Sequence, residues 1–315
     1  MNFNFSNELA RQALSRRQFL RSSAGLAAVA LGGTGLAFRR SKLLSFSTLG
    51  CPDWTFARIV DFAIKNDFQG IELRGLLRQL DLTQCSEFSS SNKAATVRLM
   101  NDHDLKFSDL GSSCTLHFPE SAERTKNLDE GKRFIDLAHE IGCPNVRVFP
   151  NNFLKERDKR ATMDLIAGGL RQLGEHARGS DVKVLVETHG DLIHADDVDY
   201  VMRTSANAHV GLIWDVTNMW IETKEPVKDV HDKLKKYIRH THLKDAIKTD
   251  GKINYVRLGK GEVPVFEAID LLHRGGYRGY YSFEWEKLWH PEIEEPELAI
   301  AHYAEVMKSH FNKNG

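Results

Sequence analysis

Apolar and polar residues follow each other in regular blocks from about residue 43 onward. Each block starts with a short apolar run, passes through a polar loop and ends in a longer stretch with apolar residues at helical spacing. Near-continuous apolar runs are typical of parallel strands that are covered on both faces. We predict strands over Leu43–Leu49, Gly70–Arg74, Lys106–Leu110, Asn145–Phe149, Lys183–Glu187, Val210–Asp215, Ile238–His242 and Tyr280–Glu284.

The stretches between these runs predict amphipathic helices. Two apolar stripes illustrate the spacing: Phe134, Leu137, Ala138 and Ile141, and Met163, Ile166, Leu170 and Leu173. Gly142 and Gly275 follow two such stretches, where the end of a helix needs a residue that tolerates a positive φ.

Eight strand-then-helix units in about 270 residues predict a (β/α)8 TIM barrel, for which about 250 residues is typical. An open doubly wound sheet is the alternative, but it normally carries a GxGxxG turn after its first strand. Here that strand runs into Gly50-Cys51-Pro52-Asp53-Trp54. Since no linker rich in Pro, Gly or Ser follows residue 42, we predict one mature α/β domain over residues 38–315.

The first 37 residues have a different pattern. Ser15–Arg21 reads SRRQFLR, and the apolar, small-residue stretch Ala24–Ala37 that follows is too short for a stable membrane span. Paired arginines before such a stretch are similar to a twin-arginine export signal, and a basic amphipathic helix is the alternative. We predict a cleavable signal peptide over residues 1–37, recognition by the twin-arginine translocation machinery and a periplasmic location in a bacterium.

Charge and cysteine content narrow the choice of function. The chain has 43 basic and 43 acidic residues, but residues 1–37 carry a net +3 and the remainder a net −3. A mildly acidic mature chain argues against nucleic-acid binding, which needs positive charge. Four cysteines without CxxC spacing are too few for a disulfide scaffold, although pairing in an oxidising compartment and free buried thiols both stay open.

Candidate chemistry lies at the ends of the last four predicted strands. In this barrel class the carboxyl ends of the strands carry the active site, and here those ends hold Glu187, Asp215, His242 and Glu284. Alternatively, these four residues are ordinary polar residues at the points where strands pass into loops. A charge directly after apolar residues needs a partner, however, and four such side chains satisfy one another around a cation. We therefore predict that these four residues bind one metal ion.

The type of ligand indicates the type of metal. Three carboxylates and one imidazole, with no thiolate, suit Mn²⁺ best, with Mg²⁺, Co²⁺ or Zn²⁺ as alternatives. Four protein ligands leave coordination positions for two adjacent substrate oxygens. A cation held in this way polarises a carbonyl and acidifies the neighbouring carbon.

The motifs at these strand ends resemble the xylose-isomerase-like sugar phosphate isomerase/epimerase family over roughly residues 43–310. They are Glu187-x-His189, Asp215 with Asn218, His240-x-His242-x-Lys244-Asp245, Glu284, Gly259–Pro264 and Gly70–Arg74. The resemblance implies the same four metal ligands. It also implies that Glu187 and Glu284 are catalytic, taking and returning a proton from opposite faces of the substrate.

Two positions depart from the family pattern. Asn218 stands where many relatives have a histidine, and Lys244-Asp245 stands where tagatose-epimerase-like members have an arginine. The second pattern resembles inosose dehydratase instead. Asn218 binds a hydroxyl but is a poor base, so elimination stays open beside epimerisation.

Further residues are candidates for substrate binding. His189 shares its strand face with Glu187, and Lys244 either binds the substrate as a clamp or proton donor or pairs with Asp245. Glu72 shares a strand face with Arg74, so it either pairs with that arginine or reaches the substrate. Trp54 follows a strand end, where an indole stacks on sugar rings. His240 lies one layer deeper than His242, which favours a supporting or packing role.

These features predict a divalent-metal-dependent enzyme of the sugar isomerase/epimerase type. It would abstract a proton next to the carbonyl of a small carbohydrate, which we expect to be non-phosphorylated because sugar phosphates are largely cytoplasmic. A lyase or dehydratase acting on keto-sugars or 3-keto-glycosides is the first alternative, and a non-catalytic carbohydrate-binding protein the second. An abasic-site endonuclease would need a multi-zinc cluster with additional histidines on the early strands, where this chain has Glu72, and the acidic mature chain opposes it. The sequence leaves homo-oligomer formation open.

Overall fold

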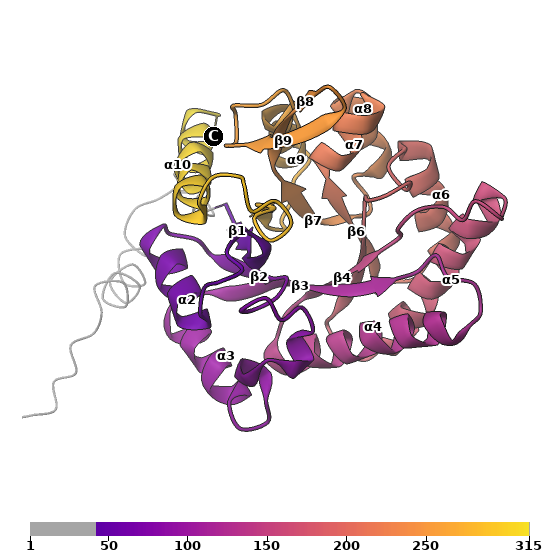
Figure 1. Cartoon of the computed structure of the whole chain (residues 1–315), viewed down its shortest axis with the longest axis horizontal. Coiled ribbons are helices and arrows are strands. Elements are labelled where there is room, and N and C mark those ends of the chain that lie inside the picture. The colour runs from indigo at the N-terminus through magenta and orange to yellow at the C-terminus, as the bar shows by residue number, and fades with distance from the viewer. Residues whose placement is uncertain (1–41, 315) are drawn as a thin grey trace, which may run out of the picture. The chain divides into compact units, whose positions relative to one another are not determined.

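The protein folds into a closed barrel of eight parallel strands, a (β/α)8 TIM barrel, in a computed structural model that describes residues 42–314 (Figure 1). The strands are β1 (Leu44–Ser47), β2 (Gly70–Leu73), β3 (Lys106–Thr115), β4 (Asn145–Phe149), β5 (Lys183–Glu187), β6 (Val210–Asp215), β7 (Ile238–Leu243) and β10 (Tyr281–Phe283). Their order around the barrel is β1-β10-β7-β6-β5-β4-β3-β2. The predicted fold class and all eight strands are confirmed. The predicted signal peptide lies outside the described residues.

Helices cover the outside of the barrel. They are α2 (Phe56–Lys65), α3 (Lys93–Asp102), α4 (Ala122–Ile141), α5 (Lys159–His176), α6 (Ala195–Ser205), α7 (Val216–Thr223), α8 (Val227–Leu234), α9 (Val265–Arg274) and α10 (Pro296–Asn314), with short 3-10 turns at Thr48–Gly50, Leu82–Gln84 and Ser86–Phe88. Both predicted apolar stripes, on α4 and α5, are buried against the barrel. In β5, Val184, Leu185 and Val186 are fully buried, as expected for a strand covered on both faces.

The two predicted helix-ending glycines behave differently. Gly142 ends α4 with a φ of 73°, as predicted. Gly275 has a φ of −72° and still continues the helical conformation, whereas Gly276 has the positive φ of 77°. Gly275 therefore directly follows α9 as predicted, but the positive φ is at the next residue, Gly276.

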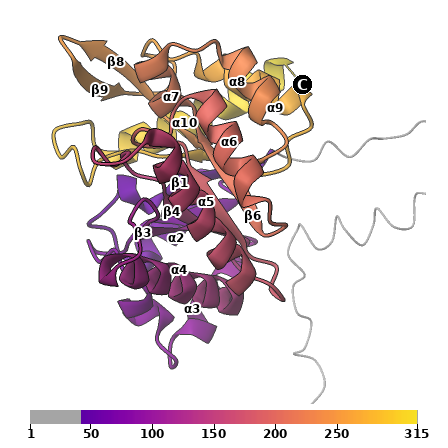
Figure 2. The same cartoon turned by 90° about the vertical axis from the view of Figure 1, so that its right-hand side faces the viewer.

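A two-stranded antiparallel hairpin interrupts the strand-helix alternation. It consists of β8 (Asp245–Thr249) and β9 (Lys252–Val256) and follows β7 directly. Figure 2 shows it standing out from the barrel. Its two-residue turn, Asp250-Gly251, has positive φ at both positions, which is the geometry that an Asp-Gly hairpin turn favours.

All four cysteines are buried as free thiols, so of the two alternatives for them the structure shows the unpaired one. Within residues 42–314, none of the helices has the length and apolar character that crossing a membrane requires.

Candidate metal centre

The four predicted metal ligands meet at one end of the barrel. Strand register places Asp215 beside His242 and His242 beside Ser282, so the ends of β6, β7 and β10 lie next to one another. Glu187, Asp215, His242 and Glu284 each offer one ligand atom within 4.8 Å of the others, and each residue is at most 3% exposed. Carboxylate oxygens and one imidazole at this spacing fit a single divalent cation that prefers oxygen and nitrogen ligands.

The imidazole of His242 lies between three carboxylates. Its Nδ1 is 2.9 Å from Glu187 Oε1 and 3.2 Å from Glu284 Oε1, while its Nε2 is 3.2 Å from Glu72 Oε1. Burial lowers the pKa of His242, but the charges of Glu284, Glu72 and Glu187 outweigh it and raise the pKa well above its usual range. In a metal-free cluster the ring therefore carries a positive charge.

Lys244 supplies a second positive charge to the same cluster. Its Nζ lies 2.5 Å from Glu284 Oε2, 2.7 Å from Asp215 Oδ2 and 2.8 Å from Glu286 Oε1, and the residue is only 1% exposed. Lys244 thus pairs with these carboxylates and not with its neighbour Asp245. The carboxylate of Asp245 instead accepts hydrogen bonds from the backbone N–H groups of Ala246, Gly259, Gly261 and Val263.

The carboxylates differ in how readily they hold a proton. Burial raises the pKa of Asp215 to about 7, although the nearby Lys244 ammonium lowers it. Burial also raises the pKa of Glu284, but His242 and Lys244 outweigh this and bring it to about 2. His242 and Arg147 likewise hold the pKa of Glu187 well below its usual range, against its burial. The two glutamates are therefore ionised at neutral pH, which a proton-accepting role requires.

Arg147, in the middle of β4, contacts the cluster from the other half of the barrel. Its Nη1 donates to Glu187 Oε2 at 2.8 Å and its Nη2 donates to the backbone oxygen of Ser112 at 3.2 Å. The guanidinium also lies 3.8 Å from the centre of the Phe149 ring. Sequence reasoning missed this residue. The available signal was its position between Val146 and Val148, which places a charged side chain on the inner face of a buried strand.

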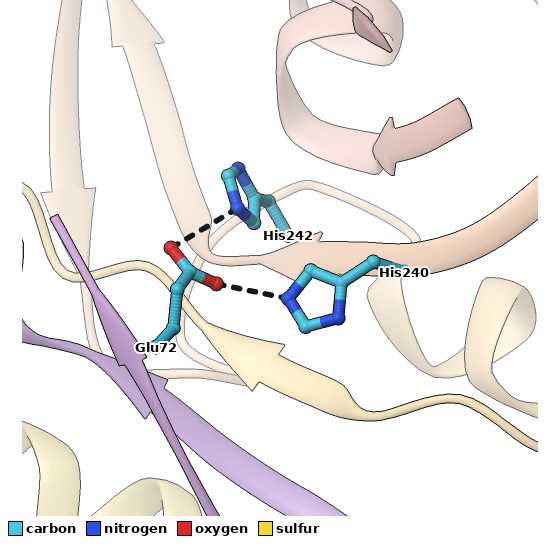
Figure 3. Close-up of side chains that lie close together, drawn as sticks. All are labelled: Glu72, His240 and His242. Carbon is cyan, nitrogen blue, oxygen red and sulfur yellow. Dashed lines mark hydrogen bonds and ion pairs between the residues drawn. The ribbon is translucent and has the colours of Figure 1, made fainter. Parts of the chain in front are cut away.

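Glu72 lies beneath the ligands and pairs with histidines. Its Oε2 accepts hydrogen bonds from His240 Nε2 at 2.9 Å and Ser282 Oγ at 2.8 Å, and its Oε1 faces His242 (Figure 3). The predicted alternative of a Glu72–Arg74 pair does not form, because the Arg74 guanidinium donates to the Gly111 backbone oxygen and to Ser113 Oγ. At 1% exposure, Glu72 is closed off from solvent.

The other predicted substrate-binding residues fall into two groups. His189 is half-buried beside Phe149, and its Nδ1 has no hydrogen-bond partner among residues 42–314. Asn218 starts the first turn of α7, where its backbone N–H donates to Asp215 Oδ1 at 2.8 Å. Trp54 lies apart from this group. It is 4% exposed, and its ring packs on Phe62 with the Arg58 guanidinium above it, so its contacts are those of a core residue.

The unpredicted hairpin adds one side chain to the cluster. Tyr255 on β9 places its ring centre 6.0 Å from Lys244 Nζ and packs edge-on against His290 at 5.1 Å. Burial raises the pKa of the Tyr255 phenol, so it stays neutral at neutral pH. The Asp-Gly turn was the sequence signal that identifies this hairpin, and with it the tyrosine.

Comparison with known proteins identifies the same architecture elsewhere. The structure is similar to the zinc-containing IOLI protein (TM-score 0.72, 16% identity, 86% of this chain and 98% of the other) and to the probable 3-DHS dehydratase AsbF of Bacillus anthracis (0.70, 18%, 84% and 98%). It is also similar to an L-ribulose 3-epimerase (0.70, 15%, 86% and 95%). These likenesses show a shared fold. A search of curated proteins found no significant match. The family model described as "Xylose isomerase-like TIM barrel" matches residues 60–310, and the chain therefore belongs to that family.

Proposed function

We propose that this protein is a divalent-metal-dependent isomerase or epimerase that removes a proton next to the carbonyl of a non-phosphorylated keto-sugar. The observation that carries the proposal is the placement of two ionised glutamates, Glu187 and Glu284, on the same imidazole nitrogen of His242 at 2.9 and 3.2 Å. Two bases at one cluster are what removal and return of a proton require. Relatives of this fold that are named as an L-ribulose 3-epimerase and a D-tagatose 3-epimerase-like protein support ketose chemistry.

Glu187, Asp215, His242 and Glu284 would hold the cation, for which we propose Mn²⁺, with Mg²⁺, Co²⁺ or Zn²⁺ as alternatives. A similar structure from Mycobacterium smegmatis is described as a complex with magnesium, and the IOLI protein is described with zinc. A divalent cation bound there polarises the substrate carbonyl and makes the adjacent C–H bond more acidic.

The chain's own residues supply the proton transfers and the binding contacts. Arg147 fixes the direction of the Glu187 carboxylate through Oε2, leaving Oε1 on the side of His242. His189 offers its unpartnered Nδ1 to a substrate oxygen. Asn218 lies one helical turn from Asp215, and its Nδ2 donates to the Thr188 backbone oxygen at 3.3 Å, so its amide oxygen is the atom that we propose to bind a substrate hydroxyl.

Charge pairing and the N-terminal motif support an uncharged substrate. The two cations that contact the cluster, Arg147 and Lys244, are already paired with carboxylates, so neither is free to bind a phosphate group. The SRRQFLR motif supports export by the twin-arginine translocation machinery to the periplasm, where sugar phosphates are scarce.

Deuterium exchange tests this proposal directly. Manganese-loaded protein is incubated in heavy water with a panel of free ketoses and 3-keto-glycosides, and the recovered sugars are analysed by mass spectrometry. We expect about one metal ion per chain and solvent deuterium on the carbon next to the carbonyl. Binding of sugar without exchange would instead indicate a carbohydrate-binding protein.

A matched pair of variants assigns the exchange to the site. Glu187→Gln should slow exchange by about 10²–10⁴-fold, the usual contribution of a positioned base, while its circular dichroism spectrum is unchanged. Glu267→Gln, on the exposed face of α9, should exchange at the wild-type rate. Undiminished exchange in Glu187→Gln would refute the assignment.

Elimination is a second candidate because of Lys244. Its buried ammonium contacts Glu284 and Asp215, so a proton donor stands beside the proposed base. After loss of the α-proton, the C–O bond at the β-carbon breaks, a C=C bond forms and the departing oxygen takes a proton from Lys244 Nζ. The similarity to AsbF, a probable 3-DHS dehydratase, supports elimination. In the same panel, a released aglycone or loss of water identifies elimination.

A further inference from the structure

Glu72 has the surroundings of an orienting group. The residue is 1% exposed, and it reaches across the barrel interior from β2 to β7 (Figure 3). Both of its carboxylate oxygens are engaged. Oε2 accepts from His240 Nε2 and Ser282 Oγ at 2.9 and 2.8 Å, and Oε1 lies 3.2 Å from His242 Nε2.

The two nitrogens of His242 face different groups. Nδ1 shares a hydrogen bond with Glu187 Oε1 and lies 3.2 Å from Glu284 Oε1, whereas Nε2 makes no hydrogen bond among residues 42–314 and has Glu72 Oε1 at ion-pair distance, 3.2 Å. A neutral imidazole has one nitrogen that carries a proton and one that offers a lone pair. A carboxylate at Nε2 stabilises the proton on that nitrogen, so the lone pair is left on Nδ1, facing the other ligands.

We propose that Glu72 is a positioning residue that fixes the tautomer and ring orientation of His242, so that Nδ1 binds the cation. The inference rests on the proposed metal-dependent function and adds a role for a residue that does not reach the substrate. Histidines that bind metals usually donate their second ring N–H to a carboxylate or carbonyl, which orients the ring and strengthens the ligand.

His240 and Ser282 in turn hold Glu72. Both donate to Oε2, and this leaves Oε1 for His242. The rings of His240 and His242 also pack edge to face, with centres 5.8 Å apart and an interplanar angle of 84°. Glu72, His240 and His242 also have the spacing of a three-residue cation site. The Glu72 carboxylate, however, already contacts His240, Ser282 and His242.

The test compares Glu72→Ala with Ser282→Ala, which removes a contact to the same carboxylate on the oxygen that does not face His242. Dissociation constants for Mn²⁺ and Zn²⁺ are measured by chelator competition, and the absorption spectrum is recorded with saturating Co²⁺. We expect Glu72→Ala to bind metal about 10–100-fold more weakly and to shift the cobalt bands, because the ring loses its orientation. Ser282→Ala should lose less affinity than Glu72→Ala and shift the cobalt bands less, because His240 still donates to Glu72 Oε2.

Glu72→Gln keeps the test decisive if the alanine variant does not fold. Its amide oxygen keeps a polar group beside His242 Nε2, but a neutral group attracts the ring N–H more weakly than a carboxylate, so we expect a loss of affinity of about fivefold with the cobalt spectrum retained. A residue that only stabilises the fold would lower the melting temperature without changing the metal affinity or the spectrum of the folded protein.

The outcomes separate this inference from the proposed function. Wild-type protein that binds no divalent cation would overturn both. Metal binding that is unaffected in Glu72→Ala and Glu72→Gln would overturn the positioning role alone. Two metal ions per wild-type chain, with one lost in His240→Ala, would also overturn it, since Glu72 would then be a ligand itself.

Discussion

The two halves of the barrel contribute to the site in different ways. Strands β5, β6, β7 and β10 end in Glu187, Asp215, His242 and Glu284, which converge as ligands. Strands β2, β3 and β4 carry Glu72, Asp109 and Arg147, which lie within the strands and are at most 2% exposed. The second half thus supplies the four groups that we propose as cation ligands. From the first half, the charges of Glu72 and Arg147 contact these groups.

The largest expected effect separates a ligand from a neighbour within the second half. Glu284 and Glu286 both accept from Lys244 Nζ, but only Glu284 belongs to the four-residue cluster. Glu284→Gln should lose divalent-metal binding in calorimetry and lower turnover by about 10²–10⁴-fold, because one ligand and one proposed base disappear together. Glu286→Gln should retain the metal. Equal losses in both variants would contradict the assignment of the ligand set.

A substitution in the first half should have a smaller effect. Arg147→Met leaves Glu187 Oε2 without its guanidinium partner, so we expect metal affinity and turnover to fall by about 10–100-fold, as for other groups that orient ligands. Arg178→Met, on an exposed arginine after α5, is the control and should change neither. If Arg147→Met lowers metal affinity and turnover as much as Glu284→Gln does, the two halves of the barrel do not have the different roles described here.

Substitution of Lys244 is expected to raise the metal affinity, whereas the preceding substitutions lower it. Its ammonium lies among the same carboxylates that would bind the cation, so the two positive charges repel each other. Lys244→Met should therefore bind Mn²⁺ about tenfold more tightly, since unit charges a few Å apart interact by about 1 kcal/mol or more. Lys248→Met, on the exposed hairpin, should leave the affinity unchanged. Weaker binding in Lys244→Met would show that the lysine supports the cation site.

The smallest effect on activity is expected at Asp109. Burial and the nearby Glu72 raise the pKa of its carboxyl well above the usual range, so the folded protein holds this proton at neutral pH. The unfolded chain releases it above about pH 4, and the free energy of unfolding therefore falls as pH rises toward the folded-state pKa. Asp109→Asn lacks this proton, so the stability difference between wild type and variant should fall by about 1.4 kcal/mol per pH unit.

Urea unfolding of both proteins from about pH 4 upward measures that slope. The amide has nearly the shape of the neutral acid, so turnover at neutral pH should stay near wild type. Stability curves that run parallel across this pH range would show that Asp109 is ionised in the folded protein.

The sequence predicted the fold in detail because most barrel strands are apolar runs in regular alternation with helical stretches. The structure differs where that signal is weak. In β3 the strand continues through Gly111–Thr115, where small and polar residues follow the apolar run. The β8–β9 hairpin was missed because it interrupts the strand-helix alternation. Its signals are the Asp250-Gly251 turn and the polar-apolar alternation of Lys252–Val256.

Within the site, the residues at strand ends were found, Glu72 was named as a candidate without its histidine partners, and Arg147 was missed. The positions of Glu187, Asp215, His242 and Glu284 follow from strand register alone, because parallel strands bring their carboxyl ends together. The contacts of Arg147 and Glu72 join strands that are far apart in the chain, 40 residues in one case and 168 in the other. Nothing local in the sequence specifies such partners.

Asp245 fixes the base of the β8–β9 hairpin. Its carboxylate holds backbone N–H groups on both sides of the hairpin, at Ala246 and at Gly259, Gly261 and Val263. A Cβ atom on Gly261 would come within 2.1 Å of that carboxylate, so the junction leaves no room for a side chain. Both ends of the segment over residues 247–258 are thus held by the carboxylate of Asp245. Because this anchor holds both ends of the segment, we expect the barrel to accept loops of other lengths and compositions there.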